Sequence, residues 1–362
     1  MLIAVLVTIV VVIVGVLIFV NTAPQFGQPP NGEAKERLKE SPHYENGKFV
    51  NLIETKMGSF GEMMGTLPDF IFGENQSPDD TLPTRYGESN GDVVDSLCYI
   101  TWYGHSAFLF EMNGKRILID PMLGETAAPT SFGSSRFPNQ QAVPLEDIRE
   151  IDLIILSHDH YDHLDYQSIM HLKDHVGHFY TALGVGSHLK KWGIPDSSIT
   201  ELDWWQTTTH DGVDLVACPA RHFSGRAIFD RNATQWASWV INSEDYKIYF
   251  SGDGGYGPHF KEIGEKYGPF DFAMLECGQY NKAWHDIHMF PEESVDAGLD
   301  LKARLSMPIH WGAFNLSIHT WTDPIKRFKD AANSSGLPVV HPYIGERFRL
   351  GVDFPNDQWW QR

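Results

Sequence analysis

Six consecutive residues, His158-Asp-His-Tyr-Asp-His163, combine three imidazoles and two carboxylates directly after an apolar run. Imidazoles this close repel one another when protonated, and burying them without a partner costs desolvation energy, whereas a divalent cation resolves both problems. His158 and His160 are two residues apart, so on an extended loop both side chains face one ion, while Asp162 and His163 turn to face a second. The spacing predicts a dinuclear metal site, against the alternative of a histidine-rich surface turn.

Three further residues of metal-binding type come after apolar, strand-like runs later in the chain. His222 follows Pro219-Ala-Arg, Asp253 follows Tyr249-Phe-Ser-Gly, and His310 follows Met307-Pro-Ile. Any one of them alone is more often a structural residue with satisfied hydrogen bonds. Because all three stand at strand ends that feed one edge, we expect them together to complete two metal sites.

These residues must be positioned by strands that begin near Leu97. Asn113-Gly114 between two apolar runs predicts a hairpin. The predicted strands are Tyr99–Trp102, Ala107–Met112, Arg116–Ile119, Ile151–Leu156, Leu215–Cys218, Ser238–Asn242, Lys247–Phe250 and Phe272–Leu275. The predicted helices are 258–267, 291–302 and 323–335, the last with Asp323 as N-cap, Pro324 at its first position and Gly336 beyond its end. Strands followed by helices and then strands indicate sheets covered by helices rather than a regular βαβ winding.

The N-terminus carries an apolar segment, Met1–Val20, that has no charged side chain. As a helix rising about 1.5 Å per residue, it spans roughly the 30 Å thickness of a bilayer's hydrocarbon core. A cleaved signal peptide is the alternative, but no basic residue precedes the run and Pro24 follows its small-residue site. We expect residues 1–21 to be an uncleaved transmembrane anchor. By the positive-inside rule, three basic residues after it favour a cytoplasmic location for the rest of the chain: Lys35, Arg37 and Lys39.

Residues 22–96 are expected to be a linker followed by an N-terminal extension. The stretch 22–34 is rich in Pro, Gly and Asn, which is typical of a linker. The extension contains Met57–Met64 and Leu67–Phe72, in which Met and Phe recur. Such residues usually pack onto a core; the alternative is an adaptable apolar surface for lipid or a long acyl chain.

The overall charge excludes one class of partner. The chain has a formal net charge of −19 over 362 residues, whereas binding a phosphate backbone needs clustered Lys and Arg. We therefore expect no nucleic acid partner, and any membrane contact to be mainly hydrophobic. The three cysteines, Cys98, Cys218 and Cys277, are far apart in the sequence, which favours buried free thiols over disulfides or a thiolate metal site.

Residues 97–350 resemble the metallo-β-lactamase-fold superfamily in the order of the histidines and aspartates described above, and no Cys stands at a ligand position. Several short sequence motifs are more specifically similar to those of N-acyl-phosphatidylethanolamine-hydrolysing phospholipase D and its bacterial relatives. The segments that carry this similarity are Gly47–Asn51, Trp102–Ala107, Asp120-Pro121, Arg221-His222 with Arg226, His288–Glu293 and Ile309–Gly312. The resemblance implies an α+β fold, a four-layer αββα sandwich over residues 97–362, preceded by one transmembrane helix.

The resemblance also implies a role for each site residue. The first metal ion would be bound by His158, His160 and His222, the second by Asp162, His163 and His310, and Asp253 would bridge the two. Two Zn²⁺ ions suit this set, with Mn²⁺ or Fe as alternatives. Catalysis would involve His288, Asp162 and Asp253. The remaining assignments each have a structural alternative: Asp120 would support a ligand or the loop backbone, and substrate would be bound by Arg226 and His105.

The predicted activity is hydrolysis, because two cations sharing a water molecule lower its pKa toward neutrality. The leading hypothesis is a phospholipase D-type phosphodiesterase that cleaves a membrane lipid such as N-acyl-phosphatidylethanolamine to phosphatidic acid and an N-acylethanolamine. The alternatives are a lactonase or other ester hydrolase of a small metabolite, and a membrane-tethered protein whose metal site is not catalytic. An apolar groove leading to the metals would favour the lipid, and a small closed polar pocket the lactone. The sequence does not indicate an oligomeric state.

Overall fold

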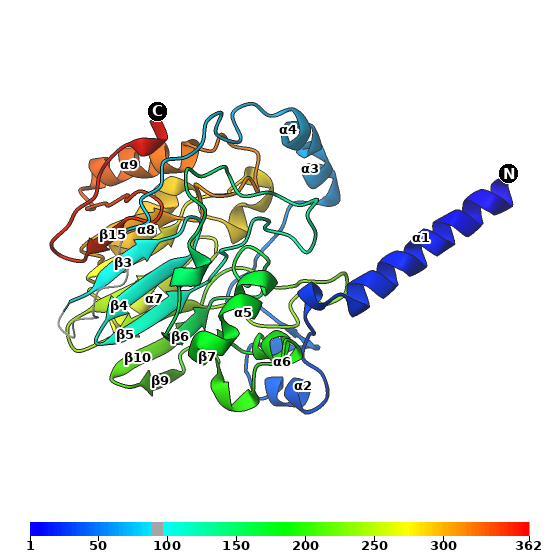
Figure 1. Cartoon of the computed structure of the whole chain (residues 1–362), viewed down its shortest axis with the longest axis horizontal. Helices are drawn as coiled ribbons and strands as arrows, with labels where there is room; N and C mark the ends of the chain where they lie inside the picture. Colours follow the sequence, from blue (N-terminus) through cyan, green and yellow to red (C-terminus); the bar gives the residue numbers. More distant parts are fainter. Residues whose placement is uncertain (88–96, 362) are drawn as a thin grey trace.

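Two mixed β-sheets pack face to face, and helices cover the outer face of each (Figure 1). The computed structural model describes residues 1–87 and 97–361. The predicted boundary at residue 96 and the last residue, 362, lie outside the described part. The arrangement is the predicted four-layer αββα sandwich of the α+β class. Its core is the set of apolar strand residues that the two inner faces bury against each other.

The first sheet has seven strands in the order β15-β3-β4-β5-β6-β7-β8. Its bounds are β3 Tyr99–Trp102, β4 Phe108–Met112, β5 Lys115–Ile119, β6 Ile151–Leu156, β7 Val176–Ala182, β8 Ile199–Leu202 and β15 Arg347–Arg349. Strands β5 to β8 run parallel, so their carboxyl ends share one edge. The predicted hairpin joins β4 and β5, with both Asn113 and Gly114 at positive φ.

The second sheet has six strands in the order β14-β13-β12-β11-β10-β9. Its bounds are β9 Thr207–His210, β10 Val213–Cys218, β11 Ser238–Asn242, β12 Lys247–Phe250, β13 Phe272–Glu276 and β14 Ser306–Ile309. Strands β12, β13 and β14 are parallel. Every strand predicted from the sequence is present, whereas β7, β8, β9 and β15 were not predicted, and β14 was indicated only as the strand-like run before His310.

Helices form the two outer layers (Figure 1). The first sheet is accompanied by α5, Tyr166–Leu172, and α6, Gly186–Lys191. The second is covered by α7, His259–Lys266, α8, Pro291–Asp300, and α9, Asp323–Ser335. These last three are the predicted helices, and Gly336 ends α9 in the left-handed conformation. The N-cap of α9 is Thr322 rather than the predicted Asp323.

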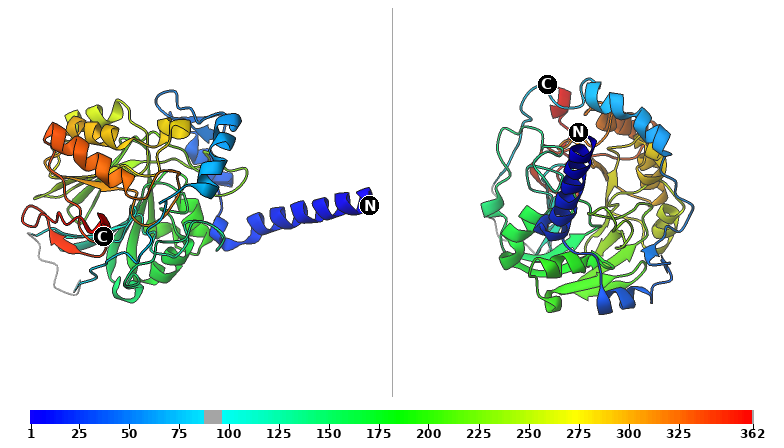
Figure 2. Two further views of the ribbon diagram at one scale, coloured as in Figure 1. Left: turned by 90° about the horizontal axis from the view of Figure 1, so that it is seen from above. Right: turned by 90° about the vertical axis from the view of Figure 1, so that its right-hand side faces the viewer.

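Helix α1, Leu2–Thr22, projects from the domain and buries none of its residues (Figure 2). It is long and apolar enough to cross a membrane. The stretch predicted as a linker is instead packed against the domain. It forms a short 3-10 turn at Pro24–Phe26, followed by α2, Gly32–Leu38, and Phe26 is buried. The indole of Trp192 donates to the carbonyl of Pro24 at 2.7 Å.

The extension continues with a small hairpin, β1 Tyr44–Glu45 and β2 Lys48–Phe49, and then α3 Phe60–Gly65 and α4 Leu67–Phe72. Ser59 and Glu62 form a capping box that starts α3. Met63, Met64 and Leu67 remain 42%, 47% and 45% exposed. The expectation that these side chains pack onto the core is therefore wrong, and the alternative of an apolar surface describes them. The three cysteines are buried free thiols, as predicted.

Candidate functional site

The predicted metal ligands converge at one edge of the sandwich because each comes after the carboxyl end of a strand. Strand β6 ends at Leu156 and runs directly into the loop that contains His158, His160 and His163. On the second sheet, His222 follows β10, Asp253 follows β12 and His310 follows β14. The structure thus brings together residues that are up to about 150 positions apart in the sequence.

The first group of ligand atoms consists of His158, His160, His222 and Asp253, all within 4.8 Å of one another. The imidazole nitrogen His160 Nδ1 lies 2.9 Å from His158 Nε2 and 3.2 Å from His222 Nε2. Asp253 Oδ2 lies 3.9 Å and 3.8 Å from the Nε2 atoms of His158 and His222. This is the set of residues expected for the first metal ion.

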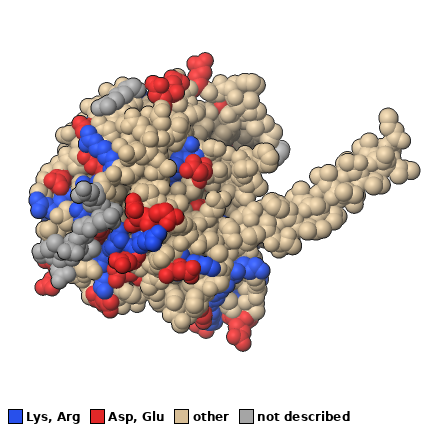
Figure 3. Space-filling model, viewed as in Figure 1, with Lys and Arg blue, Asp and Glu red and all other residues tan. Residues whose placement is uncertain are grey.

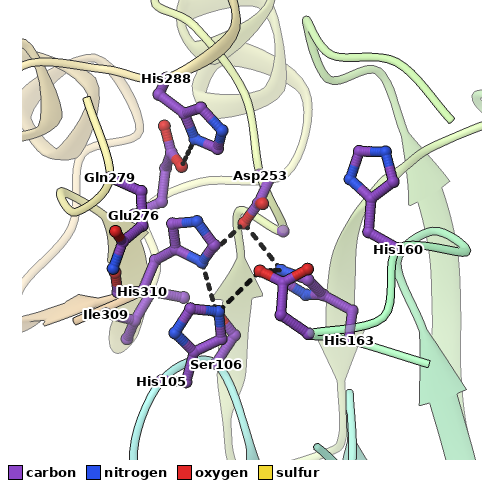
Figure 4. Close-up of polar contacts among 12 residues, drawn as sticks. His105, Ser106, His160, His163, Asp253, Glu276, Gln279, His288, Ile309 and His310 are labelled. Atoms are coloured by element: carbon purple, nitrogen blue, oxygen red, sulfur yellow. Dashed lines mark hydrogen bonds and ion pairs between the residues drawn. The ribbon is translucent and has the colours of Figure 1, made fainter. Parts of the chain in front are cut away.

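The second group consists of His105, Asp162, His163 and His310. Figure 4 labels the three histidines of this group. The other oxygen of the bridging carboxylate, Asp253 Oδ1, lies 3.1 Å from His163 Nε2 and 3.2 Å from His310 Nδ1. Asp253 therefore presents one oxygen to each group, which is the geometry a bridging ligand needs. Apart from this contact with each other, His163 Nε2 and Asp253 Oδ1 are buried without a hydrogen-bond partner, so the residues fit a pair of divalent cations.

The electrostatics of four of the clustered imidazoles suit metal binding, because imidazole ligands must be neutral. Burial, reinforced by neighbouring imidazoles, holds the pKa values of His158, His222 and His310 well below the usual range. Burial also lowers the pKa of His160 to about 4. For His163, burial lowers the pKa, but the surrounding carboxylates, Asp253 foremost, raise it well above the usual value.

Asp120 supports the ligand loop from the end of β5. Its Oδ2 lies 2.6 Å from His163 Nδ1, and its Oδ1 accepts the backbone N–H of Ser157 at 2.7 Å. One carboxylate thereby orients a ligand ring and anchors the loop that begins at Ser157. If His163 binds a metal, such a contact fixes the tautomer and raises the basicity of the ligating nitrogen, which is the supporting role predicted for Asp120.

His105 lies behind the ligands instead of lining the substrate space. It is fully buried, and its Nε2 lies 2.8 Å from Asp162 Oδ2. Its ring also packs against that of His310, with 4.2 Å between centroids. These contacts give His105 a position within or directly beside the second ligand group, in place of the predicted contact with substrate.

Arg226 was predicted to contact a phosphate, with a structural role as the alternative. Only 3% of it is exposed. Its guanidinium donates to three backbone carbonyls, those of Asp159 at 2.6 Å, Leu164 at 2.7 Å and Gln25 at 2.8 Å. These contacts favour the structural role, in which Arg226 ties the ligand loop to the segment that follows α1.

His288 lies at the site, as predicted, and its ring stacks on that of His310 with centroids 5.1 Å apart. Its partner Glu276, a buried residue at the end of β13, was not predicted to have a role (Figure 4). Glu276 Oε2 lies 2.8 Å from His288 Nδ1, and Oε1 accepts the N–H of Met289. Burial raises the pKa of Glu276 well above its usual value. The sequence feature that could have identified Glu276 is its position as an acidic residue at the end of an apolar strand, which is similar to that of Asp253.

The N-terminal extension also contributes to the site through Asn51. Its side chain brackets the backbone of His222, donating to the carbonyl at 2.8 Å and accepting from the N–H at 3.1 Å. The segment Gly47–Asn51 was one of those that carried the family resemblance. Asn51 thereby holds the backbone of a candidate metal ligand from outside the sandwich.

An apolar groove of about 510 Å³ opens onto both ligand groups. Its floor includes His160, Asp162, Asp253, His288 and His310. The walls are almost entirely apolar and come from the extension helices, from Phe223 and from the turn at 282–287; they include Met63, Met64, Leu67, Phe70, Trp284 and Ile287. The candidate metal ligands therefore lie at the end of an open hydrophobic groove.

The fold, the ligand order and the site geometry define a metal-dependent hydrolase of the metallo-β-lactamase superfamily. The sequence matches the beta-lactamase superfamily domain over residues 115–311, and the chain belongs to this family.

Among similar proteins, an uncharacterised protein of Mycobacterium tuberculosis is 37% identical over 89% of this chain and 88% of its own length. N-acyl-phosphatidylethanolamine-hydrolyzing phospholipase D 1 of Caenorhabditis elegans is 32% identical over 70% of this chain and 76% of its own length. A solved structure, Igni18, a metallo hydrolase of Ignicoccus hospitalis, aligns with a TM-score of 0.54 and 21% identity over 71% of this chain and all of its own, which indicates a shared fold.

Proposed function

We propose that this protein is a phospholipase D-type phosphodiesterase with two zinc ions, acting on N-acyl-phosphatidylethanolamine or a closely similar membrane lipid. The observation that carries the proposal is the apolar groove that ends at the metal-binding residues. Moving a long acyl chain from water onto such apolar walls lowers its free energy, whereas a small polar lactone would be stabilised little by the same contact. The similarity to the Caenorhabditis elegans enzyme supports the same substrate class.

In this reaction water adds to phosphorus and the phosphorus–oxygen bond to the N-acylethanolamine breaks, leaving phosphatidic acid. The bound cations would activate the water and offset charge on the phosphoryl oxygens. The chain's own residues position the reactants. The side chains of Met63 and Met64 on α3 and of Phe70 on α4 hold the acyl chains and keep bulk water away from them. Glu276 holds His288 by Nδ1 at 2.8 Å, which leaves Nε2 to donate a proton to the departing alkoxide.

Helix α1 supports a location at the substrate's own membrane. We propose that it spans the bilayer as an anchor, with the domain on the cytoplasmic side, in keeping with the basic residues after the helix. Figures 1 and 2 both place α3 and α4 at the end of the molecule from which α1 projects. An anchored domain in this orientation would present its groove toward the bilayer that contains the lipid.

The substrate assignment is tested with the full chain in detergent micelles and two charge-introducing variants. We expect wild type to release N-acylethanolamine from N-acyl-phosphatidylethanolamine and to leave lactones untouched. Leu67→Glu, on the groove wall, should raise KM for the lipid by about tenfold or more while hydrolysis of bis(4-nitrophenyl) phosphate continues unchanged. Leu299→Glu, an equally exposed position on α8 (45% for both residues), is the matched control. Lactone turnover without lipid turnover would reject the proposal in favour of a lactonase.

His288→Ala should keep both metal ions and lower kcat by about 10²- to 10⁴-fold, because general acid assistance to the leaving group is lost. Metal content is measured by mass spectrometry of the purified protein beside steady-state kinetics. His285→Ala provides the control, since His285 contacts Glu293 at 2.8 Å and its side chain is 43% exposed. Loss of metal from the His288 variant would show that this residue is a ligand instead.

A further inference from the structure

A second cavity lies at the root of α1, separate from the groove, and has a volume of about 450 Å³. One wall is the end of the apolar helix, with Leu17, Val20 and Asn21. The opposite wall is the loop that contains Ile228 and Phe229, which are 53% and 84% exposed. The cavity thus begins where the apolar segment ends, at the depth where a bilayer changes from hydrocarbon to headgroups.

Four cationic side chains line this cavity in a protein whose net charge is −19: Lys35, Lys48, Lys191 and Arg231. Within residues 1–87 and 97–361, the three lysines have no ion-pair partner. The one acidic residue in the lining is Asp230, and its carboxylate already accepts the backbone N–H groups of Arg226 and Ala227. Figure 3 shows blue side chains near the root of α1, whereas α1 itself carries none.

Arg231 separates this cavity from the substrate groove. Its guanidinium lies over the ring of Phe223 at 4.2 Å and contacts the sulfur of Met57. Phe223 and Met57 both line the groove, so the two cavities are neighbours across one side chain. If α1 crosses the bilayer, both cavities lie at the surface of that bilayer. The cavity at the root of α1 then has the positive charge to hold a phosphate and an apolar rim to admit acyl chains.

We propose that this cavity is a binding site for the headgroup of an anionic phospholipid that is not the substrate. The inference rests on the proposed membrane insertion of α1, since that insertion brings lipid headgroups to the cavity. Without a local site, a chain of this net charge would repel anionic lipids. Unpaired lysines in this cavity attract anionic headgroups at the membrane surface and so reverse that repulsion locally. Because only this side of the domain is attracted to the membrane, the contact would fix the rotation of the domain about its anchor.

The test uses the full chain reconstituted into nanodiscs of equal parts phosphatidylcholine and phosphatidylglycerol. Native mass spectrometry counts the lipids that stay bound after release from the disc, with phosphatidic acid counted separately. We expect about tenfold enrichment of phosphatidylglycerol for wild type and none for the triple variant Lys35→Gln, Lys48→Gln, Lys191→Gln. The matched control carries the same charge change at exposed lysines elsewhere: Lys261, Lys302 and Lys326.

Two results would overturn the proposal: equal retention of both lipids by wild type, or enrichment that persists in the triple variant. Removal of the bound lipid by millimolar inorganic phosphate would also overturn it, because the site would then be one for free anions. Flotation of the protein with vesicles after carbonate washing tests insertion of α1 separately. Hydrolysis of bis(4-nitrophenyl) phosphate by all three proteins shows that they are folded and leaves the proposed activity independent of this site.

Discussion

Replacing Asp253 by Asn should reduce bound metal to less than one ion per chain and lower kcat/KM by about 10³-fold or more. The reason is that one carboxylate serves both ligand groups, with Oδ1 within 3.2 Å of His163 and His310 and Oδ2 within 3.9 Å of His158 and His222. Asparagine keeps the shape but loses the charge and one metal-binding oxygen. Metal content and phosphodiester turnover are measured on the same preparation.

Two further variants test whether this effect is specific to the bridging carboxylate of Asp253. Asp245→Asn removes the same charge from an exposed loop position and should leave both metal content and rate unchanged. His160→Ala removes a ligand from the first group alone, so it should retain more metal than the Asp253 variant. Full activity in Asp253→Asn with two bound ions would show that the centre does not depend on a bridging carboxylate.

The convergence of the candidate ligands was predictable because they stand in the loops directly after apolar strands. A short apolar run such as Ile151–Leu156, six residues long and rich in β-branched Ile, is typical of a buried strand, and the loop after such a strand lies at the sheet edge. Strands β7 and β9 escaped prediction for the opposite reason. β9 consists of Thr and His and is only partly buried, and β7 starts with a partly exposed Val-Gly-His before its buried end, so neither shows the regular alternation that marks a half-buried strand.

Side-chain roles were harder to predict than positions. Arg226 and His105 stand in segments similar to those of a lipid phosphodiesterase, and a cation or imidazole near a metal site is consistent with substrate binding. Their actual contacts are with backbone carbonyls and with Asp162, which depend on how distant loops pack. The linker prediction failed similarly: Pro and Gly permit a flexible segment, but here the carbonyls of Pro24 and Gln25 meet the side chains of Trp192 and Arg226.

Replacing Arg226 by Met should lower the free energy of unfolding by about 3 to 5 kcal/mol, because three buried carbonyls lose their donor and each unsatisfied group costs about 1 to 3 kcal/mol. The guanidinium also lies over the ring of Tyr161 at 4.1 Å, a contact worth about 1 kcal/mol. Urea unfolding of the full chain in detergent, in the presence of chelator, separates this effect from metal binding. Arg304→Met is the control, because its side chain is 65% exposed and pairs with Asp271 at the surface.

A second substitution, Arg226→Lys, distinguishes the structural role of Arg226 from a role in binding phosphate. If it is structural, Arg226→Lys should recover only part of the lost stability, since one ammonium group does not reproduce a planar fork that reaches three carbonyls. Metal affinity should fall with stability, because two of those carbonyls, Asp159 and Leu164, lie in the ligand loop. KM for a soluble phosphodiester should stay the same in the folded, metal-loaded fraction. Wild-type stability together with a raised KM would instead show that Arg226 leaves its carbonyls to bind the phosphate.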